Sequence, residues 1–218
     1  MAESSPSLNR RIAADLLSIG AVSLAPDAPF IWASGLKSPI YCDNRLTMSY
    51  PQVRRVLTEG FATVLHQHGI EPDAIVGTAT AGIPHAAWLA HHLGVPMAYA
   101  RSRPKTHGRG NQIEGLLMRG QQVVVVEDLV STGTSSMAVV EAVQQAGIEV
   151  AALVAIFSYG LPDAGARFED AGLSFYTLTT FDTLLAVAAE QGHLAPEAID
   201  SLKAWQRDPA GWSKAHQE

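Results

Sequence analysis

The chain has 218 residues, of which 47% are hydrophobic and 17% charged, and its net charge is −6. This length and composition predict a folded protein with one sizeable core and argue against extensive disorder. The acidic balance argues against a nucleic-acid partner, because proteins that bind nucleic acid usually carry a basic surface. No run of about 18 apolar residues occurs, so a membrane span is not expected. The single cysteine and the polar residues 1–7 favour a cytoplasmic protein.

Helical and strand patterns alternate along most of the chain. Residues 1–7 are expected to form a loose tail, and residues 8–19 a helix with one apolar face. Prolines and glycines in residues 21–44 predict short strands and turns. From Pro51 onward we expect helices at 51–68, 83–93 and 137–146, and strands at 74–76, 95–100, 123–126 and 150–157. This order predicts an α/β protein with a mostly parallel central sheet and helices on both faces.

The C-terminal part departs from this alternation. We expect one more strand at 175–178, then two helices at 182–191 and 196–206, and a loose tail after Pro209. The chain is therefore interpreted as a single domain, residues 1–218. Its core is expected to span about residues 46–181. The segments 1–45 and 182–218 are expected to pair as a small hood over the edge of the sheet.

The segment Val123–Ser135 carries the strongest chemical signal. Four valines predict a strand that is buried on both faces, and Glu127 and Asp128 follow them directly. A loop of small hydroxyl residues around Gly133 then opens a helix, and this arrangement presents backbone N–H groups to an anion. It lacks the Gly-Lys-Ser/Thr ending of a Walker loop and the Gly-x-Gly-x-x-Gly of a dinucleotide fold. Carboxylates repel phosphate but accept hydrogen bonds from sugar hydroxyls, so a phosphorylated ribose suits both halves of the site.

This segment resembles the motif with which type I phosphoribosyltransferases bind phosphoribosyl pyrophosphate (PRPP). The alternative is an ordinary turn between a buried strand and a helix, which explains the two acids poorly. The resemblance implies that the following residues contact PRPP: Glu127, Asp128, Leu129, Val130, Ser131, Thr132, Gly133, Thr134 and Ser135.

A second small-residue loop, Gly77–Gly82, also lies between an expected strand and an expected helix. Small side chains allow backbone N–H groups to approach a ligand closely, although a plain turn is an equally good interpretation of this loop alone. In the type I family the matching loop holds pyrophosphate, which implies this role for Thr78, Ala79 and Thr80. Ala81 stands where many orotate-specific members have a lysine.

A basic segment, residues 101–111, follows the expected strand at 95–100. It contains Arg101, Arg103, Lys105 and Arg109, together with His107. On its own it is either a solvated surface loop or a flap that closes over a polyanion. It resembles the catalytic loop of orotate phosphoribosyltransferases, which implies that Arg101, Lys105 and His107 bind PRPP. The resemblance further implies a homodimer in which residues 101–110 act in the neighbouring subunit's site. Ser102 replaces a lysine that is frequent in that family.

A third similarity to the same family lies in Phe30-x3-Ser34-Gly35-x2-Ser38-Pro39-x-Tyr41. In the family this segment covers the base, and Tyr41 and Cys42 stand where two aromatic residues that contact orotate often occur, which implies that Tyr41 contacts orotate. Ser131 occupies the position that meets the orotate carboxylate. Ala33 stands where the family often has a lysine. The alternative is a turn-rich core segment in which Tyr41 and Cys42 are merely buried.

Taken together, the resemblance implies an orotate phosphoribosyltransferase of de novo pyrimidine (UMP) biosynthesis, which makes orotidine 5′-monophosphate and pyrophosphate from PRPP and orotate. Lys105, His107 and Asp128 would be its catalytic residues. Mg²⁺ is the expected cofactor, held mainly by PRPP and water rather than by protein ligands. Two alternatives remain open: a phosphoribosyltransferase that uses uracil or a purine, and a non-catalytic PRPP sensor that binds RNA or DNA. The net charge and the presence of Lys105 and His107 disfavour the sensor.

Overall fold

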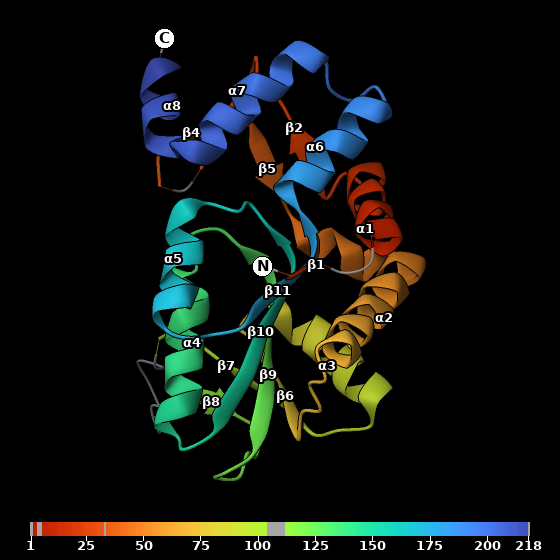
Figure 1. Ribbon diagram of the computed structural model, residues 1–218, viewed down its shortest axis with the longest axis vertical. Coiled ribbons are helices and arrows are strands. Elements are labelled where there is room, and N and C mark those ends of the chain that lie inside the picture. The colour runs from red at the N-terminus through yellow and green to blue at the C-terminus, as the bar shows by residue number, and fades with distance from the viewer. Residues whose placement is uncertain (1, 4–5, 33, 104–111, 218) are drawn as a thin grey trace.

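The computed structural model describes residues 2–3, 6–32, 34–103 and 112–217. Within these residues the centre of the molecule is a seven-stranded sheet in the order β1-β11-β10-β9-β6-β7-β8 (Figure 1). Neighbouring strands run parallel, except that β8 runs antiparallel to β7. The strands of this sheet are β1 Ala2–Glu3, β6 Ala74–Thr78, β7 Met97–Ala100, β8 Ile113–Glu114, β9 Gln122–Val130, β10 Glu149–Ser158 and β11 Phe175–Thr180. The predicted α/β class and the mostly parallel sheet are confirmed.

Helices cover both faces of the sheet (Figure 1). On one face lie α4 Thr134–Gln145 and α5 Pro162–Asp170, and on the other lie α1 Pro6–Ser18, α2 Pro51–Gln67 and α3 Gly82–Leu93. The valines of β9 alternate between the two layers, with Val123 and Val125 in one core and Val124 and Val126 in the other. All four are fully buried, because a strand side chain points to alternate faces and both faces are covered.

The remaining elements form a smaller unit at one end of the sheet (Figure 1). Two short antiparallel pairs belong to it: β2 Val22–Leu24 with β5 Ile40–Cys42, and β3 Phe30–Ile31 with β4 Lys37–Ser38. It also contains the 3-10 helix η1 Asn44–Ser49 and the helices α6 Phe181–Glu190, α7 Pro196–Arg207 and α8 Pro209–Ala215. We call this unit the hood. N- and C-terminal segments meet in it, because the backbone N–H of Lys37 donates to Ser213 Oγ at 2.9 Å. The proposed boundaries between hood and core stay a prediction.

Several local expectations were wrong. The tail after Pro209 is helix α8, whose first turn is capped by the Asp208 carboxylate, which accepts from the N–H of Gly211 at 2.8 Å. Within the expected loose tail 1–7, Ala2–Glu3 pairs with β11 as an edge strand and α1 already begins at Pro6. Helix α5 was not predicted, because it is only nine residues long. Strand β9 also continues past the valines, so Glu127 and Asp128 lie inside the strand rather than after it.

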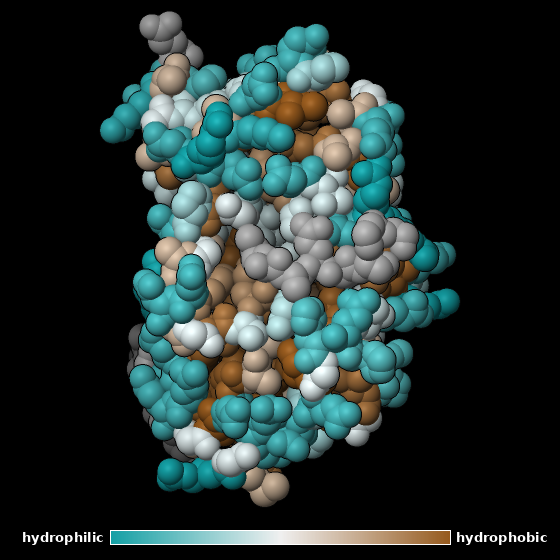
Figure 2. Space-filling view, in the orientation of Figure 1, coloured by the Kyte–Doolittle hydropathy of each residue, from teal (hydrophilic) through white to brown (hydrophobic). Residues whose placement is uncertain are grey.

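The surface of the described residues is mainly polar along the outer faces of the helices (Figure 2). None of the described helices combines the length and the apolar character needed to cross a membrane. Large exposed hydrophobic side chains include Ile31 and Tyr41 of the hood. Both line the pocket that is described below.

Candidate active site

The two acids of β9 have different surroundings. Glu127 is only 8% exposed, and both of its carboxylate oxygens have hydroxyl partners. Thr78 Oγ1 donates to Glu127 Oε1, and Ser136 Oγ donates to Oε2 at 3.1 Å. Asp128 is half-buried, and its side chain contacts the Glu127 carboxyl group. Asp128 is therefore the more accessible acid at the carboxyl end of the strand.

Burial, and after it the charge of Asp128, raise the pKa of Glu127 to about 8. Burial also raises the pKa of Asp128, while its hydrogen bond to Glu127 acts in the opposite direction. Two carboxyl groups in contact titrate as a pair, so burial and mutual repulsion favour the protonated form of this pair more than that of an exposed acid.

The loop Ser131–Gly133 joins β9 to α4, and together with Thr134 and Ser135 of the first turn of α4 it makes up the segment in which the anion cup is expected. Gly133 has φ of 75°, a left-handed conformation that favours glycine, and it immediately precedes the helix. Thr132, Thr134 and Ser135 are exposed. The first N–H groups of a helix have no partner within the helix, so the start of α4 offers donors to a phosphate. Val130, in contrast, is 1% exposed and belongs to the core, so its side chain is not available to PRPP.

Helix α5 packs against this loop. A Cβ atom added to Gly133 would lie 2.8 Å from Phe168 Cζ, so the ring of Phe168 packs directly against the glycine. Arg167 Nε donates to the carbonyl oxygen of Thr132 at 3.2 Å. No sequence pattern indicated this support, because α5 itself was not predicted.

The Gly77–Gly82 loop lies beside β9, but its glycines serve packing. A Cβ atom on Gly77 would lie 2.9 Å from Ala86 Cβ, and one on Gly82 would lie 2.4 Å from the Val126 carbonyl oxygen. These close contacts bring α3 against β6 and β9. The Thr78 side chain is occupied with Glu127, whereas Thr80 is exposed and Ala79 half-buried. The peptide bond between Ala79 and Thr80 is cis.

A pocket of about 540 Å³ lies between the hood and the end of β9. It contains both residues that were expected to contact orotate, Tyr41 and Ser131. Cys42 also lines it, as does Leu129, one of the expected PRPP contacts. The remaining lining residues are Ile31, Trp32, Ser34 and Tyr159. Trp32 and Tyr159 were missed, although Tyr159 follows a buried strand as closely as the acids do.

Asn44 connects the hood to the acids. This residue of η1 is 1% exposed, and its Nδ2 donates to the Asp128 carbonyl oxygen at 2.6 Å. Its Oδ1 accepts from Cys42 Sγ at 3.3 Å. The amide therefore fixes the backbone of the accessible acid relative to the pocket wall. No sequence pattern pointed to Asn44 or to Ser136.

Part of the basic segment can be placed. Arg101 is half-buried next to the Gly77–Gly82 loop, because Ala79 N donates to the carbonyl oxygen of Ala100 at 2.8 Å. The Arg101 guanidinium lies 5.5 Å from the centre of the Tyr99 ring. Within the described part of the chain, its buried Nε atom has no hydrogen-bond partner. Lys105, His107 and Arg109 lie outside the described residues, as does Ala33.

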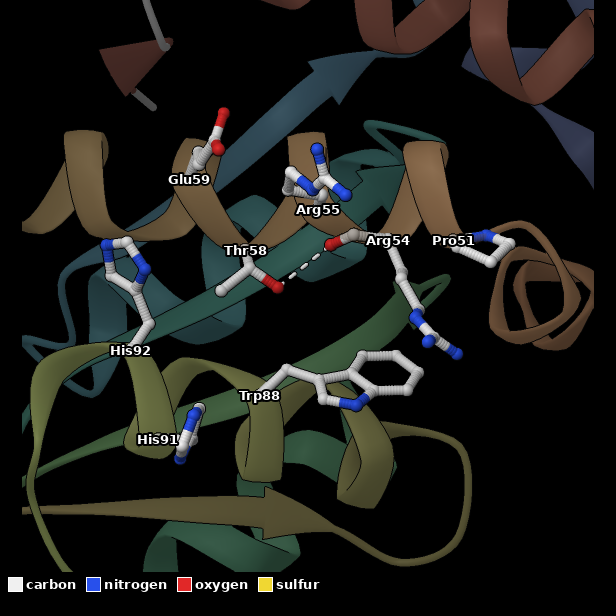
Figure 3. A pocket seen from close by; sticks show the side chains of 8 residues that line it. All are labelled: Pro51, Arg54, Arg55, Thr58, Glu59, Trp88, His91 and His92. Atoms are coloured by element: carbon white, nitrogen blue, oxygen red, sulfur yellow. Dashed lines mark hydrogen bonds between the residues drawn. The ribbon is translucent and has the colours of Figure 1, made fainter.

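A separate pocket of about 260 Å³ lies between α2 and α3 (Figure 3). Arg54 lies over the Trp88 ring at 5.1 Å, and Arg55, His91 and His92 also line this pocket. None of the residues expected to bind PRPP or orotate contributes to it. The pocket at the end of β9 is therefore the candidate active site.

Comparison with known proteins identifies the family of this chain. Residues 51–177 match the phosphoribosyl transferase domain. The orotate phosphoribosyltransferase of Bacillus pumilus is 54% identical over 206 residues, which cover 94% of this chain and 97% of that protein. This chain belongs to the orotate phosphoribosyltransferase family. The resemblance stated from the sequence is confirmed.

Further relatives agree with this family and with its fold. The orotate phosphoribosyltransferase of Bacillus subtilis is 52% identical over 202 residues, which cover 93% of this chain and 94% of that protein. The crystal structure of orotate phosphoribosyltransferase from Aeropyrum pernix is 30% identical and superposes with a TM-score of 0.72, covering 84% of this chain and 99% of that one. The central sheet with helices on both faces is therefore the type I phosphoribosyltransferase fold.

Proposed function

We propose that this chain transfers ribose 5-phosphate from PRPP to orotate, giving orotidine 5′-monophosphate and pyrophosphate in pyrimidine biosynthesis. One observation carries the proposal: the accessible acid Asp128, the anion cup and the hood pocket meet at the carboxyl end of β9. Open α/β sheets bind ligands at this edge. The spatial order of acid, cup and pocket corresponds to ribose, 5′-phosphate and base.

The mechanism needs no protein nucleophile. The bond from the anomeric carbon to pyrophosphate breaks, and a bond from that carbon to an anionic ring nitrogen of orotate forms. Residues 131–135 hold the 5′-phosphate, and Asp128 accepts hydrogen bonds from the ribose hydroxyls. The enzyme thus acts by positioning its two substrates and by stabilising the departing charge. Arg101, Lys105 and His107 supply the cations for that charge.

Mg²⁺ is part of the proposal as a cofactor. Among the described residues, no group of three or more His, Cys, Asp or Glu side chains is arranged to hold a metal ion. Glu127 already accepts from two hydroxyl groups, so Asp128 is the carboxylate that suits a hydrated ion bound mainly by substrate. When bound, Mg²⁺ would neutralise part of the pyrophosphate charge.

The proposal also covers assembly and location. We expect a homodimer in the cytoplasm, in which residues 101–110 act in the partner's site. Arg101 begins this segment beside the Gly77–Gly82 loop, and its guanidinium is a cation that can pair with an anionic substrate. The net charge of −6 argues against a nucleic-acid partner.

One assay tests the activity. The protein is mixed with PRPP, orotate and Mg²⁺, and the loss of orotate absorbance is followed; orotate should be consumed and pyrophosphate released in equal amounts. A parallel panel with uracil, adenine, guanine and hypoxanthine should give little product. Turnover of another base in preference to orotate would refute the base assignment. PRPP binding without any turnover would instead favour the sensor.

Asp128→Asn tests the sugar contact. The substitution keeps the size of the side chain but removes the negative charge that accepts from the ribose hydroxyls. We expect the KM for PRPP to rise and kcat to fall, with a combined loss in kcat/KM on the order of a hundredfold. Glu141→Gln on the exposed face of α4 is the control and should behave as the parent does. Parental PRPP kinetics for Asp128→Asn would contradict the role of this acid.

A further inference from the structure

The pocket at the end of β9, which we call the hood pocket, has a wall that depends on the C-terminal helices of the hood. Tyr159 lines the pocket but is only 3% exposed, so most of its ring is packed against other aromatic side chains. Its ring lies 5.4 Å from that of Trp32, which also lines the pocket. Phe157 makes an edge contact with Tyr159 from the sheet, at 5.4 Å and 84°.

Trp205 of α7 lies behind this pair. It is fully buried and does not line the pocket. Its ring meets Tyr159 at 5.4 Å and Trp32 at 5.6 Å, with an interplanar angle of 85° in both cases. Edge-to-face contacts of this kind are favourable and directional, so Trp205 fixes the orientation of both pocket rings together.

The next residue of α7 holds the backbone of the same wall. Gln206 Nε2 donates to the Tyr159 carbonyl oxygen at 2.8 Å. A Cβ atom added to Gly160 would lie 2.9 Å from this Gln206 nitrogen, so the amide lies directly against the chain that follows β10. One turn of α7 thus contacts both the ring and the backbone of Tyr159.

Helix α8 extends the support to the hairpin that carries Trp32. The Trp32 backbone N–H donates to the carbonyl oxygen of Leu36 at 2.9 Å, which closes the turn between β3 and β4. Beside that turn, the Lys37 backbone N–H donates to Ser213 Oγ of α8, and Lys37 Nζ donates to the His216 carbonyl oxygen. The C-terminal segment therefore contacts both parts of the pocket wall: α7 contacts Tyr159, and α8 contacts the hairpin that carries Trp32.

We propose that Trp205 and Gln206 are positioning residues for the base, which set the affinity for orotate by holding Trp32 and Tyr159 in place. This inference rests on the proposed binding of orotate in the hood pocket. The contacts that back the expected anion cup come from Phe168 and Arg167 of α5, so the PRPP site should be independent of Trp205 and Gln206.

The test is a split between the two Michaelis constants. Trp205→Leu and Gln206→Ala should each raise the KM for orotate, by roughly tenfold for Trp205→Leu, while the KM for PRPP stays within about twofold of the parent. Trp205→Phe keeps an aromatic edge and should recover most of the orotate affinity. Phe61→Leu is the control, because Phe61 of α2 is equally buried but contributes nothing to the pocket.

The outcomes separate the possible failures. A parental KM for orotate in a folded Trp205→Leu protein would overturn the inference. The inference would also fail if Trp205→Leu raised the KM for orotate and the KM for PRPP equally and Phe61→Leu did the same. Gln206→Ala is the milder change and keeps the test decisive if Trp205→Leu does not fold. Lack of orotate turnover by the parent chain would instead refute the proposed function.

Discussion

The two acids at the end of β9 have different proposed roles, which their neighbouring side chains determine. Thr78 and Ser136 orient the Glu127 carboxyl group, and Asn44 fixes the backbone of Asp128. A buried acid with raised pKa and hydroxyl partners suits a supporting role, since its oxygens already have donors. Asp128 is thereby left to meet the sugar. This assignment of the two acids is a hypothesis that Asp128→Asn tests directly.

His85 gives a prediction about stability at the same scale. Burial lowers the pKa of His85 to about 4, well below its ordinary value of 6.5. Between these values the unfolded chain binds a proton that the folded chain does not, so stability falls as the pH falls through this window. The expected loss is about 2 kcal/mol between pH 7 and pH 5. His85→Gln should lose that much less than the parent when urea unfolding is compared at the two pH values.

The control for this measurement is His193→Gln. His193 is exposed in the folded protein, so its replacement should leave the difference between pH 7 and pH 5 as it is in the parent. An identical pH dependence in His85→Gln and the parent would show that His85 takes up its proton without a cost to folding.

At the scale of elements, the expected anion cup depends on the contact between the start of α4 and the short helix α5. Gly133 has a positive φ and lies against Phe168, so two separate constraints exclude a side chain at this position. Arg167 adds a hydrogen bond to the Thr132 carbonyl oxygen. The shape of the expected anion cup therefore depends on α5, a helix that follows the cup in the sequence by about 30 residues.

Gly133→Ala should disturb this contact. The positive φ costs about 1–2 kcal/mol for an alanine, and the methyl group must also displace the Phe168 ring. We expect a lower midpoint of urea unfolding and a KM for PRPP raised by roughly tenfold. Gly172→Ala is a matched control, because Gly172 has φ of 61° but open space around it. It should lose similar stability and keep the parental KM for PRPP.

The double variant Gly133→Ala/Phe168→Leu separates the two constraints. The smaller leucine should make room for the methyl group and recover part of the PRPP affinity. If Gly133→Ala and Gly172→Ala have the same KM for PRPP, the contact with Phe168 has no part in shaping the cup.

For the whole molecule, the proposed site needs two copies of the chain. Lys105 and His107 are expected to act in the partner's site, whereas Asp128 acts in its own. Lys105→Ala and Asp128→Asn should each lower turnover strongly as homodimers. In a mixed dimer one of the two sites would combine an intact acid with an intact flap.

Mixing the two inactive variants should therefore restore activity, to at most about half of the parental value per dimer. Heterodimers can be isolated with two different affinity tags and assayed by orotate absorbance. Heterodimers as inactive as their parents would indicate that each site is built from one chain.

The amino-acid sequence by itself determined the alternation of helices and strands and the doubly buried valine strand, and it predicted the anion cup. These features are local: the spacing of apolar residues and the position of one glycine are sufficient to predict them. The fourfold valine run predicted burial on both faces, and all four side chains are buried. The expected orotate contacts Tyr41 and Ser131 also line one pocket.

Only the tertiary structure decided which acid is accessible, what supports the expected anion cup and which helices support the wall of the hood pocket. Thr78, Ser136 and Asn44 are distant from one another in the chain and meet the acids only because β6, α4 and η1 converge on β9. Helix α8 forms where the local pattern suggested a loose tail, because Trp212 and Ser213 are buried there and Ser213 bonds the β3–β4 hairpin. Burial and hydrogen bonding between remote segments leave no period in the sequence, so these features had to come from the fold.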